Sequence, residues 1–205
     1  MNARAHEEDT AWFGAVLAVG CAAMLMLALL FAEAFLRARA EAWPPLGVPR
    51  IPRVLPTLNL AVLAGVSGLL RRGLRDQAKP SRPFDRLRID RSYRSRDTGQ
   101  EPEGGDPRSK LEQGAALVLG LVFLGLDVAL WRLLFTSGFT LTQTGAYGAL
   151  FYALTVTHAA LTLVGLCGLA ALLRRPGAPG RRGWTLYWDF LGVAWAAIVV
   201  GVIWL

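Results

Sequence analysis

Four ionisable side chains stand inside long apolar stretches of this sequence: Glu33, Asp127, His158 and Asp189. Carboxyl and imidazole groups are the ones that proteins use to bind metals and to move protons. Placing such a group among apolar residues costs free energy, so each of the four is a candidate functional residue. Proton transfer would require several of them along one path, and a metal site would require two or more strong ligands in one cavity.

Two of the four have a basic neighbour that would explain them without any chemistry. Glu33 precedes Arg37 by four residues, which suits an ion pair on the surface of a helix. Asp127 lies close to Arg132 near the end of its apolar stretch. We therefore favour a structural role for Glu33 and a paired charge near an interface for Asp127.

Asp189 stands about six residues inside the last apolar stretch, a position that allows two roles. Its carboxylate would lie within reach of Arg181 or Arg182 if those side chains fold back along the helix. We favour this paired charge, and a proton-collecting role is the alternative.

His158 is the one histidine in an apolar stretch, since His6 lies in the charged amino terminus. A haem or copper site needs more strong ligands than this chain can supply. We expect the ring to form a hydrogen bond within a helical bundle, with Thr155, Thr162 or a neighbouring helix, in preference to proton transfer. The sequence also lacks nucleotide-binding glycine loops, Cys-x-x-Cys and His-Glu-x-x-His motifs. No catalytic, cofactor-binding or metal-ligating residue is assigned, and an independent enzyme is not expected.

The elements that hold these residues are five stretches suited to crossing a bilayer. Hydrophobic residues make up 54% of the chain and the mean hydropathy is +0.39. A helix needs roughly 20 residues to span the hydrocarbon core. We predict spans at 11–36, 54–70, 113–132, 146–173 and 183–205, the second being short. The expected fold is an all-α integral membrane protein, a bundle of five transmembrane helices forming one membrane domain.

The connecting segments differ in charge, which predicts the orientation. They are the tail 1–10 and the segments 37–53, 71–112, 133–145 and 174–182. Residues 71–112 contain twelve basic and eight acidic residues. They also contain four prolines and one pair of adjacent glycines, which interrupt regular structure, so we predict a disordered loop. The side with the amino terminus carries 17 basic residues and the other side five. The positive-inside rule then places the amino terminus in the cytoplasm and the carboxyl terminus in the periplasm. The net charge of +7 is a topology signal, not a sign of nucleic-acid binding.

The fourth span contains Tyr147-Gly148, Thr155 and Gly165, the 37–53 loop contains Trp43-Pro44-Pro45, and the last span contains Trp188 and Trp195. In order and spacing these motifs resemble those of the cytochrome c oxidase subunit III family. The fourth span has the order and spacing of that family's most recognisable helix, from Tyr147 to Gly165. The 37–53 loop resembles its external Trp-Pro-Pro loop, and the last span resembles its closing Tyr-Trp helix. The positions that carry the resemblance are Trp43, Pro44, Pro45, Tyr147, Gly148, Thr155, Gly165, Trp188 and Trp195.

The resemblance implies the short bacterial form of the family, with five helices. It implies a non-catalytic accessory subunit of a haem-copper terminal oxidase in the inner membrane, within an aerobic respiratory chain. Haem and copper would then reside in partner subunits, with the catalytic subunit as the main partner. In the family this subunit supports proton uptake, protects the catalytic subunit from inactivation and holds phospholipid.

Several polar positions of the family are changed in this chain. The family's intramembrane glutamate corresponds to Ala22, a second histidine to Leu161 and the aspartate of the closing helix to Gly192. These departures indicate a divergent member and question a proton role. Two alternatives stay open: an accessory subunit of a nitric oxide reductase assembly, and a small channel or transporter lined by His158 and Asp189.

Overall fold

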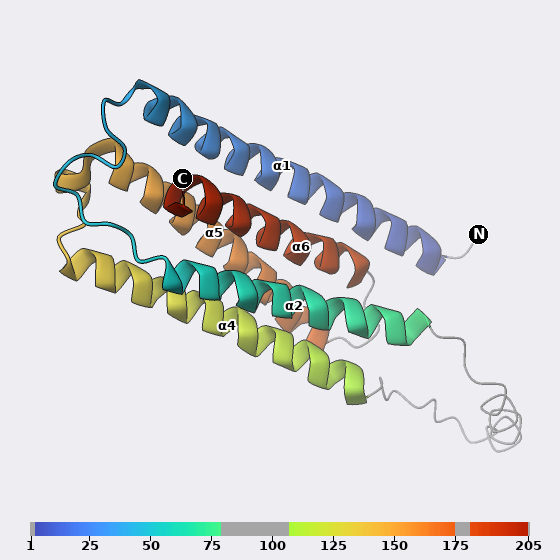
Figure 1. Cartoon of the computed structure of the whole chain (residues 1–205). Coiled ribbons are helices and arrows are strands. Elements are labelled where there is room, and N and C mark those ends of the chain that lie inside the picture. Colours follow the sequence, from blue (N-terminus) through green and yellow to red (C-terminus); the bar gives the residue numbers. More distant parts are fainter. Residues whose placement is uncertain (1–2, 79–106, 175–180, 205) are drawn as a thin grey trace, which may run out of the picture.

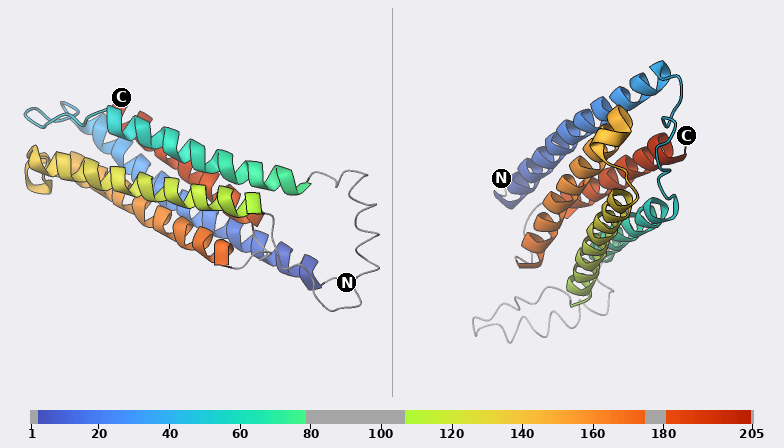
Figure 2. Two further views of the ribbon diagram at one scale, coloured as in Figure 1. Left: turned by 90° about the horizontal axis from the view of Figure 1, so that it is seen from below. Right: turned by 90° about the vertical axis from the view of Figure 1, so that its left-hand side faces the viewer.

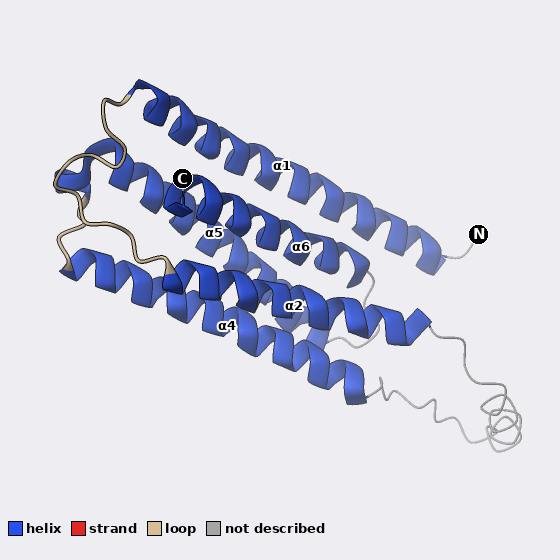
Figure 3. Ribbon diagram, in the orientation of Figure 1, coloured by secondary structure: helices blue, strands red, loops and turns tan. Residues whose placement is uncertain are grey.

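The computed structural model describes residues 3–78, 107–174 and 181–204, and the described part of each of the five predicted spans is helical (Figure 1, Figure 3). The helices are α1 (Ala3–Arg39), α2 (Val54–Ala78), α4 (Pro107–Thr136), α5 (Leu141–Arg174) and α6 (Arg181–Ile198), which continues as the π-helical turn η2 (Val199–Trp204). Five helices are long and apolar enough to cross a membrane, and the described ranges contain no strand. The predicted five-helix transmembrane bundle is confirmed.

The helices extend beyond the predicted spans on the strongly basic side. α1 begins at Ala3, α2 continues to Ala78 and α4 begins at Pro107, so residues 71–78 and 107–112 are helical rather than part of a loop. A helix can leave the hydrocarbon because its backbone hydrogen bonds lie within the segment, and arginine and glutamate favour helix. The rest of the predicted loop, 79–106, lies outside the described residues, and so does the prediction of disorder.

α6 occupies the centre of the bundle (Figure 1, Figure 2). It packs against α1, α2 and α5, while α4 packs against α2 and α5. In the most apolar window of the last span 50% of the residues are buried inside the bundle, against 11% for the first span. α1 is therefore a peripheral helix whose apolar sides face outward, as suits a helix surrounded by lipid.

Glycines of α5 allow the aromatic side chains of α6 to approach its backbone. A β-carbon added at Gly165 would lie 3.1 Å from the rings of Trp188 and Tyr187, and one added at Gly168 would overlap the Trp184 ring. Trp188 is fully buried at this contact. Small residues permit close helix packing in membranes, where lipid and protein interior are equally apolar.

The 40–53 loop, the α4–α5 turn and η2 lie together at the end of the bundle opposite the amino terminus (Figure 1). α5 is interrupted there at Gly145, whose φ of 57° and ψ of −137° are accessible to glycine but strained for other residues. This break sets the direction in which the helix resumes just before Tyr147. Tyr147 thereby packs edge-on against Trp43 of the loop, with ring centroids 5.1 Å apart.

Candidate functional site

His158 is completely buried and bonds to a neighbouring helix. Its Nε2 lies 2.9 Å from the carbonyl oxygen of Leu191 on α6. Because a carbonyl only accepts, Nε2 carries the proton and donates it. The ring also packs against Phe123 and Trp195, with centroids 5.4 and 5.0 Å away.

Of the partners predicted for His158, the neighbouring helix is the one observed at the ring. Thr162 donates its hydroxyl to the His158 backbone carbonyl at 3.0 Å, and Thr155 donates to the backbone carbonyl of Phe151. A threonine hydroxyl that donates to a backbone carbonyl of its own helix has no second proton to donate to the His158 ring. The other ring nitrogen, Nδ1, has no hydrogen-bond partner among the described residues.

Asp127 forms a hydrogen bond with Asn59, and the prediction that its charge is paired with Arg132 was wrong. Asn59 Nδ2 donates to Asp127 Oδ1 at 2.8 Å, and both side chains are buried. Positions five apart on a helix point about 140° away from each other, so Arg132 lies on another face of α4. The pair links α2 to α4. Asp127 Oδ2 and Asn59 Oδ1 make no hydrogen bond with another described residue.

Asp189 forms an ion pair with Arg71 of α2, a partner that the sequence did not predict. The prediction of Arg182 was wrong, and the side chain of Arg181 lies outside what the structure describes. The distance from Arg71 Nη2 to Asp189 Oδ2 is 2.8 Å. Two helical turns, about 10 Å, separate Asp189 from Arg182, whereas packing brings α2 alongside. Arg182 instead lies over the Trp12 ring of α1, 4.8 Å from its centroid.

Glu33 is buried, so its predicted position on a helix surface was wrong. Its side chain is 4% exposed and lies beside the Trp43 indole, with Arg37 near enough to act on it electrostatically. The contact with Trp43 is not well directed, since Glu33 Oε1 and Trp43 Nε1 both lack a partner with hydrogen-bond geometry. Arg37 donates to the Gly201 carbonyl of η2 at 3.2 Å. The loop returning from α1 covers a position that the helix alone would expose.

The four predicted polar residues do not form one site. Each contacts a different partner, and three of these contacts join α5 to α6, α2 to α4 and α2 to α6. Within the described ranges, no group of three His, Cys, Asp or Glu side chains is placed to hold a metal ion. These three contacts join helices to one another, and no two of the four side chains are brought together to act on one bound molecule.

Aromatic donors add three further links that the sequence reasoning missed. Trp131 Nε1 donates to Thr155 Oγ1 at 3.1 Å, and the Tyr187 hydroxyl donates to the Leu161 carbonyl at 2.7 Å. Trp195 Nε1 donates to the Pro56 carbonyl of α2 at 2.9 Å. These links could have been anticipated, because a buried Trp N–H or Tyr O–H usually donates to a hydrogen-bond acceptor. Thr155 and Trp195, two positions of the family resemblance, thus hold helices together.

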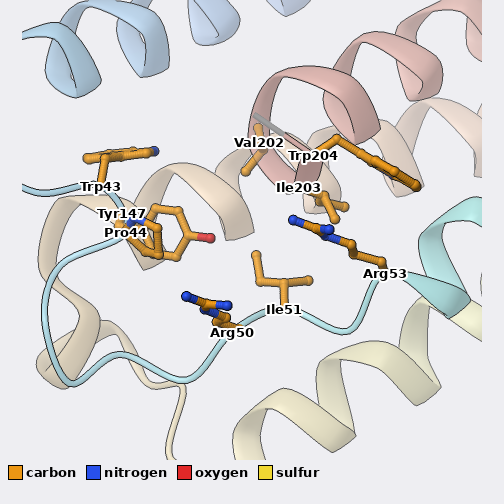
Figure 4. Close-up of a pocket in the computed structure, with 9 residues that line it drawn as sticks. All are labelled: Trp43, Pro44, Arg50, Ile51, Arg53, Tyr147, Val202, Ile203 and Trp204. Atoms are coloured by element: carbon orange, nitrogen blue, oxygen red, sulfur yellow. The ribbon is translucent and has the colours of Figure 1, made fainter.

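A cavity of about 470 Å³ opens at the end of the bundle that contains the 40–53 loop (Figure 4). Its walls come from residues 43–53, from Tyr147 of α5 and from the end of η2. Arg50 and Arg53 extend toward it from the loop, on either side of Ile51 (Figure 4). Pro44 of the Trp-Pro-Pro motif lines it, and Pro45 accepts a backbone hydrogen bond from Val48 in the adjacent turn. Sequence reasoning did not find this cavity, because it depends on three segments distant in the chain.

The fold and these contacts define a multi-pass helical membrane protein whose interior polar groups join helices. The chain is 26% identical over 201 residues to cytochrome c oxidase subunit 3 of Synechocystis sp., a match that covers 94% of this chain and 74% of that protein. It is 33% identical over 100 residues to cytochrome c oxidase subunit 3 of Bacillus subtilis, covering 44% of this chain and 48% of that protein. No family model matches the chain. The chain is thus similar to cytochrome c oxidase subunit 3 along most of its length, as its motifs predicted.

Proposed function

We propose that this protein is a non-catalytic accessory subunit of a haem-copper terminal oxidase. The observation that carries the proposal is the similarity to a cytochrome c oxidase subunit 3 along 94% of the chain. Haem and copper would belong to the partner subunits, and electron transfer and oxygen reduction would take place there. This chain would stabilise the catalytic subunit within an aerobic respiratory complex of the bacterial inner membrane.

Assembly and lipid binding are the roles that we assign to it. The position of the family's intramembrane glutamate is Ala22, which is 7% exposed and carries no ionisable group. Proton uptake through that position is therefore not part of the proposal. Between α4 and α5 an apolar groove of about 620 Å³ is lined by Val128, Trp131, Phe135 and Tyr152, and it suits a phospholipid acyl chain.

The proposed topology has the amino terminus in the cytoplasm and the carboxyl terminus in the periplasm. It is supported by the excess of basic residues on one side of the membrane, 17 against five. The start of α1, the end of α2 and the start of α4 lie at one end of the bundle (Figure 1). In this topology the 40–53 loop and its cavity face the periplasm.

Purification of the tagged chain from its native membrane in mild detergent tests the proposed function. We expect haem-bearing subunits to co-purify in fixed proportion, detected by mass spectrometry and by a reduced-minus-oxidised absorption spectrum. An unrelated multi-pass protein with the same tag, prepared from the same membrane, is the control. Recovery of the chain alone or as a homo-oligomer would contradict the proposal and favour a channel or transporter.

Turnover of the purified complex then distinguishes the two haem-containing alternatives. An oxidase consumes oxygen, whereas a nitric oxide reductase assembly consumes nitric oxide. We expect oxygen consumption that is retained through purification. A complex that reduces nitric oxide and leaves oxygen untouched would show that the chain serves the other class of enzyme.

A further inference from the structure

We propose that the cavity beside Tyr147 binds the phosphate group of an anionic phospholipid in the outer leaflet. This inference rests on the proposed function and gives its lipid role a specific site. The cavity measures about 470 Å³, and two arginines, Arg50 and Arg53, line it. Both reach toward its interior (Figure 4).

Tyr147 supplies a third donor to the same space. Its side chain is 4% exposed, and its hydroxyl points toward the region between the two arginines (Figure 4). The ring is fixed by edge-on contacts with Trp43 and Phe139, with centroids 5.1 and 5.7 Å away. Glu33 and Arg37 are the charged groups that act on the hydroxyl electrostatically. The hydroxyl has one proton that it can donate to an acceptor in the cavity.

The donor set matches an anion with several oxygens. Guanidinium groups present forked N–H donors that fit phosphate, and neither Arg50 nor Arg53 is in an ion pair with another described residue. Arg53 lies over the Trp204 ring at 5.2 Å, which limits its freedom before a ligand binds. The nearby carboxylate, Glu33, has Arg37 beside it and so does not neutralise these two arginines.

The walls and the position of the cavity favour a lipid as the source of the phosphate. Pro44, Ile51, Val202 and Ile203 give it apolar surface that a free inorganic anion would not cover. Trp204 at its edge is 54% exposed, at the helix ends where tryptophan meets the headgroup region. A basic pocket at this depth suits a headgroup phosphate with its glycerol against the apolar wall.

Titration of the detergent-purified full chain with phosphatidylglycerol, followed by native mass spectrometry, tests the site. Removing both cations in Arg50→Gln/Arg53→Gln should weaken binding by about tenfold or more, the effect of losing charge-assisted hydrogen bonds. Tyr147→Phe keeps the packed ring and should weaken it by roughly three- to tenfold. Arg39→Gln removes one positive charge at the same end of the bundle, outside both cavities, and should change affinity less than about twofold.

Two further measurements decide between sources of the anion. Phosphatidylcholine, which carries no net charge, should bind to the wild type more weakly than phosphatidylglycerol does. A roughly 10-fold excess of inorganic phosphate should not displace phosphatidylglycerol. Displacement by phosphate would assign the site to a free anion and overturn the lipid assignment. Unchanged phosphatidylglycerol binding in Arg50→Gln/Arg53→Gln would overturn the site itself.

Co-purification of the same variants keeps this inference separate from the proposed function. We expect Arg50→Gln/Arg53→Gln to bring down haem-bearing subunits while losing phosphatidylglycerol. If the variant instead releases those subunits and still binds the lipid, a partner's carboxylate occupies the cavity and the lipid assignment is wrong. If wild type binds the lipid but never co-purifies with haem, the proposed function fails while the site stands.

Discussion

The buried side chains of His158 and Asp127 form hydrogen bonds to neighbouring helices. His158 is fully buried and donates to the Leu191 carbonyl, and Asp127 accepts from Asn59 across the α2–α4 contact. A polar group in an apolar interior is costly unless it is hydrogen-bonded. Each bond thus favours one register between two helices. At this scale the family resemblance of Thr155 and Trp195 is explained by the helix contacts that they make.

The pair of Asp127 and Asn59 gives a prediction about charge and hydrogen bonding. Asp127→Asn should change stability by less than about 0.5 kcal/mol, because the amide oxygen can still accept from Asn59. Asp127→Ala should cost about 1–3 kcal/mol, since the buried Asn59 amide loses its acceptor. Thermal unfolding of the purified chain in detergent measures both.

Asp189→Ala is the matched control for this prediction. Its partner Arg71 is 59% exposed at the side chain, so breaking this ion pair should cost under about 1 kcal/mol. If Asp127→Asn is as damaging as Asp127→Ala, the negative charge itself is required, and a purely structural role for Asp127 is wrong.

At the scale of elements, α5 and α6 form the core contact because glycine on one helix receives aromatic rings of the other. Trp184 and Trp188 of α6 lie against Gly168 and Gly165 of α5. Lipid tails are as apolar as leucine, so this close packing, more than the hydrophobic effect, stabilises the contact. The peripheral α1 has a smaller buried share and contributes less to the core.

Substitution of one of these glycines should separate the two helices. Gly168→Ala places a methyl group in the Trp184 ring and should cost about 1–3 kcal/mol, as overpacking does. Gly192→Ala on α6 has open space around the added carbon and should stay within about 0.5 kcal/mol. Thermal unfolding in detergent compares the two variants.

A smaller ring at position 184 tests the assigned cause. In Gly168→Ala/Trp184→Phe the added methyl group should be tolerated better than in the single variant, so the double-mutant cycle should show a favourable coupling of about 0.5–3 kcal/mol. Strictly additive effects of the two substitutions would show that the Gly168 methyl group does not act through the Trp184 ring.

The whole molecule has one strongly basic end and one end with few cations. Excess lysine and arginine is retained on the cytoplasmic side during insertion. The helix ends at Ala78 and Pro107 lie at the amino-terminal end of the bundle, and the 40–53 loop lies at the other (Figure 1). The topology proposed from charge therefore assigns a side of the membrane to every described segment.

Single cysteines test this orientation in intact cells. In a chain with Cys21 and Cys167 replaced by alanine, Glu41→Cys should react with a membrane-impermeant maleimide, because the proposed topology places the 40–53 loop in the periplasm. Arg72→Cys, at the opposite end of the bundle, should react only after the inner membrane is permeabilised. Both positions are exposed in the folded chain. The reverse pattern of labelling would invert the topology.

The number and type of the helices, and their resemblance to subunit III, could be predicted from the sequence alone. Span length and hydropathy add up along the chain and need no knowledge of neighbours. Tertiary structure alone decided the partners of Asp127, Asp189 and Glu33 and brought Arg50, Arg53 and Tyr147 to one cavity. The physical reason is that lipid and protein interior are both apolar, so the sequence carries little signal about which face of each helix turns inward. Side-chain partners depend on that rotation, and packing of the five helices sets it.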